Sequence, residues 1–420
     1  MKIAINAIRV SKKSGGGLET YIINLVNELA KIISRINTND NELTRIKNIE
    51  FDVYTLYPEH FPEVKPERII NPVNVVAQFI GWIKKLIIIS QQNIMSDKSD
   101  DSLSIWKKIL PSGGDTLRIL WTQFIFPFYL LTRKYDILFS PTQLDALVLC
   151  PIPQIITIHD TIPFLFSEYK HKQKIYLKYL LPMILRKVKR VITISENTKN
   201  DVVNFFGIPV EKISVIHYGI KKPNFPISNE EIKNFKKKNM LDRYILCISS
   251  NFPHKNLLRL IEAFYIVKKR QGDINLLIAG YQEKKYQTEI NKKISELVLK
   301  NKIKILGHFP QNQLSTIYAG AELFVFPSLY EGFGLPPLEA MTYSCPVVVS
   351  NTSSLPEVVG DAGVYVNSYN PKDIANGIIK VLTDENLRHN LIKKGFEQVK
   401  KFSWEKAARE TLKVFEENLS

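Results

Sequence analysis

The chain alternates short runs of β-branched and other apolar residues with longer stretches whose apolar residues recur at helical spacing. The short runs are typical of buried strands, and the longer stretches are typical of amphipathic helices that cover a sheet. Such alternation favours βα units with parallel sheets. We therefore predict strands at Lys2–Ile8, Phe51–Leu56, Ile137–Ser140, Gln154–Ile158, Val191–Ile194, Ser214–His217, Tyr244–Ile248, Asn275–Ala279, Lys302–Leu306, Leu323–Phe326 and Pro346–Val349.

These strands fall into two groups, which predicts two Rossmann-like, doubly wound α/β domains in tandem. The joint is expected at Tyr218–Ser228, a stretch with one glycine, two prolines and little periodicity. We accordingly place the domains at residues 1–218 and 219–402. Parallel sheets bind ligands outside the carboxyl ends of their strands. Two such sheets that face each other predict an active site in the cleft between the domains.

Composition narrows the class of protein. The 420 residues include 45% hydrophobic and 23% charged side chains, which is ordinary for a folded soluble protein and excludes wholesale disorder. Three cysteines spaced about a hundred residues apart form neither a disulfide framework nor a zinc motif, and they fit a reducing compartment. The N-terminus lacks the pattern of a signal peptide, and no segment reaches the roughly 18–20 apolar residues that span a bilayer. We therefore expect a cytoplasmic protein.

The net charge of +16 would suit an anionic partner such as a nucleic acid or a membrane. The chain has no aromatic-interleaved basic motif, so we expect no nucleic-acid partner. From Lys170 to Arg190 there are eight Lys or Arg and no acidic residue, with Pro182 expected to kink the helix. This stretch is either a solvated helix face or a contact with an anionic membrane or a lipid-linked acceptor, which would place the protein on the inner face of the membrane. The apolar run Phe79–Ile89 allows the same two interpretations, buried helix or interfacial helix.

The most informative stretch is Phe326–Met341, FPSLYEGFGLPPLEAM. It follows an apolar strand, passes through a loop with two glycines and enters a helix through Pro336 and Pro337, which suit a helix's first turn. The amides at such a helix start can hold a phosphate. Glu331 and Glu339 bracket this site, and carboxylates are good acceptors for pairs of sugar hydroxyls.

Two glutamates with seven residues between them in this setting resemble the nucleotide-sugar site of family 4 retaining glycosyltransferases, whose two-Rossmann-domain architecture is called GT-B. The resemblance covers nearly the whole chain and is weakest from about residue 57 to 134. Further stretches match the family in the same order: the glycine loop Gly15–Tyr21, ITIHDTIPFLF (156–166), VITISENTKNDVVNFFGIPVEKISVIHYGI (191–220), NFPHKN (251–256), GHFPQNQLSTIYAGAELFVFPS (307–328) and CPVVVSNTSSLPEVVGDAG (345–363).

The resemblance implies roles for matching residues. Glu339 is expected to bind the ribose hydroxyls and Glu331 the transferred sugar, while Lys255 offsets the charge of the diphosphate. The remaining expected contacts are His159 with Asp160 on the sugar side, the amides of Phe333, Gly334 and Leu335 on the diphosphate, Gly15, Gly16 and Gly17 beside acceptor or phosphate, and Ser250, Asn251, His254 and Asn256 in the loop around the lysine.

The sequence departs from the family at one point. Many members carry an arginine about five residues before the lysine, and here Ser250 or Asn251 stands in its place. Either side chain can hydrogen-bond a phosphate but adds no charge, and a protonated His254 would compensate. No D-x-D pair sits in the setting of a metal-dependent transferase, so we expect neither metal nor cofactor. The last helix, within 403–420, resembles the family's segment that crosses back onto the N-terminal domain.

We therefore predict a retaining hexosyltransferase that acts in bacterial surface polysaccharide synthesis, of O-antigen or capsule. The expected partners are a GDP- or UDP-linked sugar, with GDP-mannose first, and a glycan or lipid-linked acceptor. Two alternatives stay open: another GT-B enzyme of nucleotide sugars, such as a 2-epimerase, and a catalytically silent partner subunit.

Overall fold

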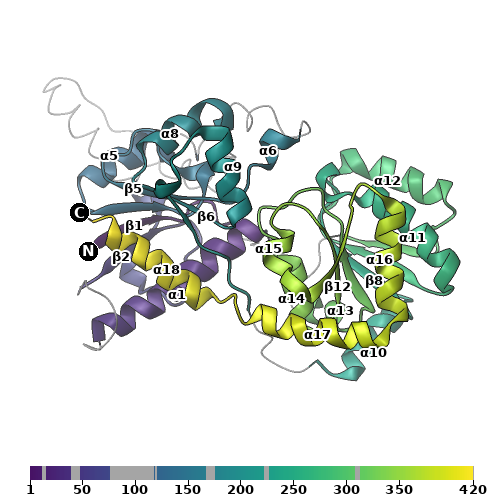
Figure 1. The fold of residues 1–420 in the computed structure, drawn as a ribbon. Helices are drawn as coiled ribbons and strands as arrows, with labels where there is room; N and C mark the ends of the chain where they lie inside the picture. The colour runs from purple at the N-terminus through teal and green to yellow at the C-terminus, as the bar shows by residue number, and fades with distance from the viewer. Residues whose placement is uncertain are drawn as a thin grey trace, which may run out of the picture.

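A computed structural model describes residues 1–11, 16–38, 48–75, 118, 121–166, 176–221, 227–307 and 313–419. They form two lobes, each built on a twisted parallel sheet with helices on both faces (Figure 1). Several predicted features lie outside the described residues: Gly15, the apolar run 79–89, residues 170–175 of the basic stretch, and parts of the joint (222–226) and of the GHFPQNQ motif (308–312).

In the described part of the N-terminal lobe, seven parallel strands form a sheet in the order β3-β2-β1-β4-β5-β6-β7. These strands are β1 (Lys2–Asn6), β2 (Glu50–Tyr54), β3 (Ile69–Ile70), β4 (Ile137–Ser140), β5 (Gln154–Ile158), β6 (Arg190–Thr193) and β7 (Ile213–Val215). The helices around them are α1 (Gly17–Thr38), α5 (Phe126–Leu131), α6 (Ile162–Leu165), α8 (Leu181–Lys187) and α9 (Glu196–Phe206). Pro182 lies in the first turn of α8, where the chain leaves a π-helical turn at Tyr176–Leu180.

In the C-terminal lobe, six parallel strands are described, in the order β10-β9-β8-β11-β12-β13. They are β8 (Tyr244–Ile248), β9 (Asn275–Ala279), β10 (Ile303–Leu306), β11 (Leu323–Phe326), β12 (Val347–Ser350) and β13 (Gly363–Val366). The helices of this lobe are α10 (Asn229–Lys238), α11 (Leu257–Gln271), α12 (Lys284–Glu296), α13 (Leu314–Ala319), α14 (Leu335–Thr342), α15 (Leu355–Val359), α16 (Pro371–Thr383) and α17 (Glu385–Val399). The last helix, α18 (Trp404–Glu417), follows α17.

Both strand orders reverse direction at one point, and this position decides where ligands bind. The reversal lies between β1 and β4 in the first sheet and between β8 and β11 in the second. Loops leave such a switch point on opposite faces of the sheet and open a crevice at the carboxyl ends of the strands. The loops after β1, β8 and β11 carry the glycine loop, Lys255 and Glu331, respectively. The fold thus brings the described glycines, Lys255 and Glu331 to the two switch points, whereas His159 and Asp160 follow β5.

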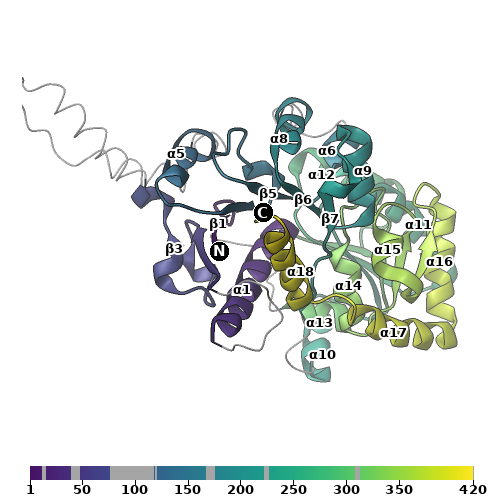
Figure 2. The ribbon, with the colours of Figure 1, turned by 60° about the vertical axis from the view of Figure 1, so that its left-hand side comes forward.

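The last helix joins the two lobes. From α17 in the C-terminal lobe the chain crosses back, and α18 lies along α1 in both views of the ribbon (Figures 1 and 2). Phe415 of α18 packs edge-on against Phe139 of β4, with ring centroids 5.1 Å apart. The segment that crosses back, at Trp404, packs directly against the joint between the lobes at Gly219. A Cβ atom on Gly219 would lie only 2.1 Å from the backbone nitrogen of Trp404. Only glycine fits at this position.

Apolar contacts continue from one lobe into the other. One buried cluster includes β1, α1 and β4 of the first lobe together with β11, α14 and α15 of the second. Between them lie aromatic rings near the crossing: Tyr218 has its ring centroid 5.0 Å from that of Phe333 and 5.8 Å from that of Trp404. The lobes therefore meet through packed side chains.

Candidate active site

Lys255 and Glu331 form a charged pair in the loops at the switch point of the second sheet. Lys255 ends the turn that precedes α11, and Glu331 lies in the loop between β11 and α14. The ammonium nitrogen of Lys255 lies 2.7 Å and 2.9 Å from the two carboxylate oxygens of Glu331. The lysine side chain is 17% exposed and the glutamate side chain 9%. Two residues 76 positions apart are thus paired in a largely dry environment, where an unpaired charge is costly.

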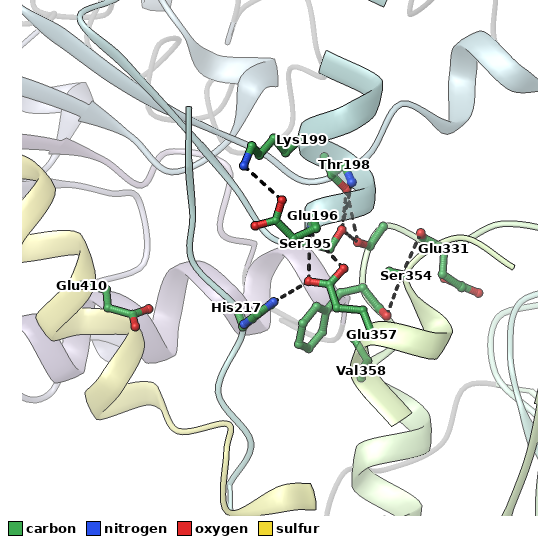
Figure 3. Close-up of polar contacts among 12 residues, drawn as sticks. Ser195, Glu196, Thr198, Lys199, His217, Glu331, Ser354, Glu357, Val358 and Glu410 are labelled. Carbon is green, nitrogen blue, oxygen red and sulfur yellow. Dashed lines mark hydrogen bonds and ion pairs between the residues drawn. The ribbon is translucent and has the colours of Figure 1, made fainter. Parts of the chain in front are cut away.

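Serines of the following loop hold the backbone around Glu331. The Glu331 amide donates to Ser353 Oγ at 3.0 Å. Ser354 Oγ lies 3.1 Å from the Glu331 carbonyl oxygen and 2.7 Å from that of Phe333 (Figure 3). Buried loop backbone needs such partners, because an unpaired buried peptide group costs about as much as a lost hydrogen bond. The loop is therefore a fixed shape rather than an open connection.

The start of α14 has the geometry that the sequence predicts. Gly334 caps the helix with a φ of 105°, a conformation that favours glycine, and Pro336 and Pro337 follow in the first turn. A Cβ on Gly334 would also lie 2.7 Å from the Leu355 side chain. The first amides of a helix have no partner within the helix and carry its positive dipole end. The amides of Phe333, Gly334 and Leu335 stand at this end.

Glu339 lies one turn further along α14. Its Oε2 accepts a hydrogen bond of 2.8 Å from the hydroxyl of Tyr318 on α13. Burial raises the pKa of the carboxyl group, and the bond from Tyr318 opposes that shift. Glu339 thus binds Tyr318 instead of joining the pair of Lys255 and Glu331.

His159 directly follows β5 and is held by two partners of its own lobe. Its Nε2 lies 2.7 Å from the Pro141 carbonyl oxygen, which can only accept, so Nε2 carries the proton. Nδ1 then accepts from the hydroxyl of Tyr218. Burial lowers the pKa of His159 to about 4, which keeps the ring neutral at pH 7. The contact of His159 with a sugar stays a prediction.

Asp160 follows His159, and the sequence left open whether it assists that histidine or caps the local backbone. Its Oδ1 accepts from the Ile162 amide at 3.1 Å, so it caps the backbone. Burial raises the pKa of Asp160 to about 6, and the nearby Lys255 opposes this shift. The Asp160 side chain also adjoins the Glu331 loop, since a Cβ on Gly332 would lie 3.0 Å from Asp160 Cβ.

The other residues of the loop after β8 have structural partners. Asn251 exchanges hydrogen bonds of 2.9 Å and 2.7 Å with the backbone of Glu283. The Asn256 amide group donates to the carbonyl oxygens of Pro327 (3.0 Å) and Ser368 (2.6 Å). Ser250 is half-buried beside them. These bonds fix the loop that carries Lys255.

His254 does not supply the second positive charge that the sequence allowed. Burial lowers the pKa of its imidazole to about 3, and the adjacent ammonium of Lys255 lowers it further. The ring is therefore neutral at pH 7. Lys255 is left as the cation of this loop.

The described glycines after β1 leave space beside them. A Cβ on Gly16 or Gly17 would have no atom within 4 Å, so neither glycine is required by contact with the protein itself. Gly17 begins α1, which places a second helix start near the carboxyl ends of the first sheet.

Several residues at the lobe interface were not singled out from the sequence. Figure 3 shows Glu357 of α15 beside His217 and the first turn of α9, and Ser195 and Thr198 next to the Glu331 loop. Tyr330 reaches Asp201 of α9. Tyr330 directly precedes Glu331, and Glu357 lies within the motif SLPEVV. Their positions in or beside a family motif were the only feature of the sequence that could have identified them.

Three further features of the described residues concern metal binding, membrane spans and disulfides. No group of three or more His, Cys, Asp or Glu in this part of the chain could hold a metal ion. Among the same residues, no helix is long and apolar enough to cross a membrane. The three cysteines are free thiols.

Two facing Rossmann-like lobes with this site between them define a GT-B glycosyltransferase. The solved structure of Anabaena HepE in complex with UDP-glucose has the same fold, with a TM-score of 0.69 and 16% sequence identity over 99% of each chain. The model of "Glycosyl transferases group 1" matches residues 228–398, and that of "Glycosyltransferase Family 4" matches residues 90–222.

Two relatives of this chain are O-antigen mannosyltransferases. The O-antigen chain mannosyltransferase B of Escherichia coli is 32% identical over 266 residues, which are 62% of this chain and 69% of the relative. The O-antigen chain mannosyltransferase RfbU of Salmonella typhimurium is 34% identical over 239 residues, 56% of this chain and 64% of the relative. The chain belongs to the family 4 glycosyltransferases, among relatives that are O-antigen mannosyltransferases.

Proposed function

We propose that this glycosyltransferase moves a hexose from a nucleoside diphosphate sugar to a hydroxyl of a glycan or lipid-linked acceptor, with retention of anomeric configuration, in surface polysaccharide synthesis. Mannose from GDP-mannose is the first candidate donor, because both relatives described above are mannosyltransferases. The observation that carries the proposal is the buried pair of Lys255 and Glu331 at the switch point, next to the helix start of α14.

The donor's charge and hydroxyls find matching partners in this cleft. Lys255 and the amides of Phe333, Gly334 and Leu335 supply positive charge and donors for the diphosphate. Glu331 accepts from hydroxyls of the transferred sugar, and Glu339 offers an oxygen to the ribose. Groups fixed before the reaction stabilise a leaving diphosphate without reorganising, which is an effective form of electrostatic catalysis. That HepE binds UDP-glucose supports a nucleotide-sugar donor for this fold.

The transfer itself needs few protein groups. The bond between the sugar's anomeric carbon and the diphosphate oxygen breaks, a bond from that carbon to the acceptor oxygen forms on the same face, and the acceptor proton passes to the leaving phosphate. Because Lys255 and the start of α14 already offset the diphosphate charge, we expect turnover without an added metal ion. Turnover that stops in EDTA and returns with Mg²⁺ would contradict this expectation.

We also propose that the enzyme works at an anionic membrane surface. In the described part of the basic stretch, Lys178, Arg186, Lys187 and Lys189 are exposed. Exposed apolar side chains lie on α5 and the π-helical turn before it, on the loop after β4, and on α8 and the π-helical turn before it: Phe124, Phe128, Leu131, Leu149, Tyr179, Leu180 and Met183. Exposed basic and apolar groups on neighbouring elements suit a surface of anionic lipid.

Hydrogen bonds show that these elements adjoin one another. Gln123 before α5 bonds the backbone of Ala146 at 2.8 Å and that of Val148 at 3.0 Å, and the Tyr176 hydroxyl bonds the Gln143 carbonyl oxygen at 2.6 Å. We expect Lys178→Gln with Arg186→Gln and Lys187→Gln to lose co-sedimentation with phosphatidylglycerol vesicles. Lys284→Gln with Lys285→Gln and Lys292→Gln, on α12, is the control for lost charge. Equal sedimentation of both triple variants would contradict the membrane contact.

Purified protein incubated with GDP-mannose, UDP-glucose and a lipid-linked acceptor tests the function. We expect transfer from one donor, with the anomeric configuration of the product determined by NMR. Glu331→Gln should lower kcat by about 100-fold or more, because it removes the negative charge and replaces one acceptor oxygen at the reacting sugar with a donor. Glu296→Gln, an exposed glutamate of α12, is the control. Conversion of the donor without acceptor would instead indicate an epimerase, and nucleotide binding without turnover would indicate a silent subunit.

A further inference from the structure

The loop that carries Glu331 is held by both lobes. From its own lobe, Ser353 and Ser354 bond the backbone of Glu331. From the other lobe, Ser195 Oγ lies 2.8 Å and Thr198 Oγ1 3.3 Å from the carbonyl oxygen of Gly332. Both hydroxyl side chains are fully buried. The residue directly after Glu331 is therefore fixed by the first turn of α9.

The residue directly before Glu331 crosses the interface as well. The Tyr330 hydroxyl bonds the Asp201 carboxylate and accepts from the Asn197 side-chain amide at 2.7 Å, and both partners belong to α9. Thr161 donates to the same Asp201 oxygen at 2.5 Å. A hydrogen bond to a charged group contributes more than one between neutral groups. Tyr330 and Gly332 thus bind α9 on either side of Glu331.

Glu357 adds an ionic contact to the same helix. Its two carboxylate oxygens each lie 3.0 Å from the Glu196 amide, the first residue of α9, where the helix dipole favours negative charge. Its Oε1 also lies 2.6 Å from His217 Nε2 (Figure 3). Burial raises the pKa of Glu357, but the bonds from His217 and the Glu196 amide outweigh it, so the carboxylate stays ionised at pH 7.

One short segment couples these contacts. Ser354 precedes α15 and hydrogen-bonds the backbone of the Glu331 loop, while Glu357 lies within α15 and hydrogen-bonds the start of α9. A shift of α15 against α9 must therefore move the backbone of Glu331. The fit is also tight, because a Cβ on Gly332 would lie 2.1 Å from the His159 carbonyl oxygen.

We propose that the contacts of Tyr330, Gly332 and Glu357 with α9 and His217, here called the loop clamp, position Glu331 for sugar transfer when the two lobes are closed. Tyr330, Asp201 and Glu357 are positioning residues that act through Glu331 and do not touch the donor. The inference rests on the proposed function for its kinetic consequence, whereas its conformational consequence is independent of activity.

Two variants test the clamp. Tyr330→Phe removes the hydroxyl that binds Asp201 and Asn197, and Glu357→Gln removes the charge at the start of α9. Each has a control with the same substitution away from α9: Tyr281→Phe, whose hydroxyl bonds Glu283 at 3.0 Å, and Glu417→Gln, which pairs with Lys413 at 3.9 Å on α18.

Kinetics and solution scattering provide separate readouts. Misplacing a reacting group by about 1 Å can cost about 100-fold, so we expect kcat of each clamp variant to fall by about 10-fold or more. The dissociation constants for GDP and UDP, from calorimetry, should change less than about twofold, because nucleotide contacts stay intact. In small-angle X-ray scattering with bound nucleotide, both clamp variants should have a larger radius of gyration than wild type and the controls.

Each other outcome overturns the proposal. An unchanged kcat shows that Glu331 needs no clamp, and an equal loss of nucleotide affinity assigns Tyr330 or Glu357 to ligand contact. If the wild-type protein transfers no sugar, the proposed function fails, but scattering still decides the clamp. An unchanged radius of gyration in both variants then overturns it.

Discussion

Replacing Lys255 with methionine tests the charged centre of the site. Methionine keeps much of the apolar stem and removes the ammonium group that binds both oxygens of Glu331. The variant leaves a carboxylate that is only 9% exposed without its cation, close to the carboxyl group of Asp160. The same change also removes the positive charge that we assign to the diphosphate.

The geometry sets the size of the effect. At about 2.8 Å and an effective dielectric constant of about 20, two unit charges attract by about 6 kcal/mol. Desolvation of both groups offsets part of this attraction, and removal of one partner from a buried pair costs about 3–5 kcal/mol. Because Lys255 retains 17% exposure, we expect the lower end, about 3 kcal/mol. With about 2.1 cal/mol/K of unfolding entropy per residue, a chain of 420 residues shifts by about 1 °C per kcal/mol, so the melting temperature should fall by about 3 °C.

A double-mutant cycle measures the pair. Urea unfolding of wild type, Lys255→Met, Glu331→Gln and the double variant gives four free energies of unfolding. We expect the double variant to lose less than the sum of the single variants, with a coupling energy of about 2–3 kcal/mol. A Lys255→Met protein as stable as wild type, or strictly additive losses, would refute the buried ion pair as the organising contact of this site.

Three further variants address other contacts. The pKa of Asp160, about 6, lies above its ordinary value, so this group stabilises the fold below about pH 4 and that contribution is lost as pH rises through 6. Asp160→Asn should therefore raise the melting temperature relative to wild type at pH 8 but not at pH 4. Gly332→Ala should lower kcat, measured by initial rates, because the added Cβ would lie 2.1 Å from the His159 carbonyl oxygen. A wild-type rate would show that the lobes do not close this tightly. Tyr218→Phe should lower the urea-unfolding free energy by about 1–3 kcal/mol, since it leaves buried Nδ1 of His159 unpaired. No measurable loss would contradict the hydrogen bond between Tyr218 and His159.

The architecture was accessible from periodicity because parallel strands buried on both faces are nearly continuous apolar runs. The predicted bounds of β4, β5, β8, β9 and β11 are the observed ones. Two strands were missed. β3 has only two residues, both half-buried, and β13 begins with a glycine and is mostly half-buried, so neither has a clear apolar signal.

In the candidate site, too, some features could be predicted from the sequence and others could not. The sequence by itself supplied Glu331, Glu339 and Lys255 through their motifs, and the helix start at Gly334 through its glycine and prolines. It could not show that burial keeps His254 neutral or that Asn251 binds the backbone of Glu283, because both depend on what surrounds the loop.

Only the tertiary structure decided which residues meet across the cleft. Tyr330 and Asp201 are 129 positions apart and Glu357 and Glu196 are 161 apart, and neither pair has a spacing that a strand or helix repeat would reveal. Local periodicity reflects how each element covers its own sheet, whereas contacts between lobes depend on how two finished sheets face each other. The sequence therefore determined two sheets and the chemistry at their ends, and the packing of the lobes determined which of those groups work together.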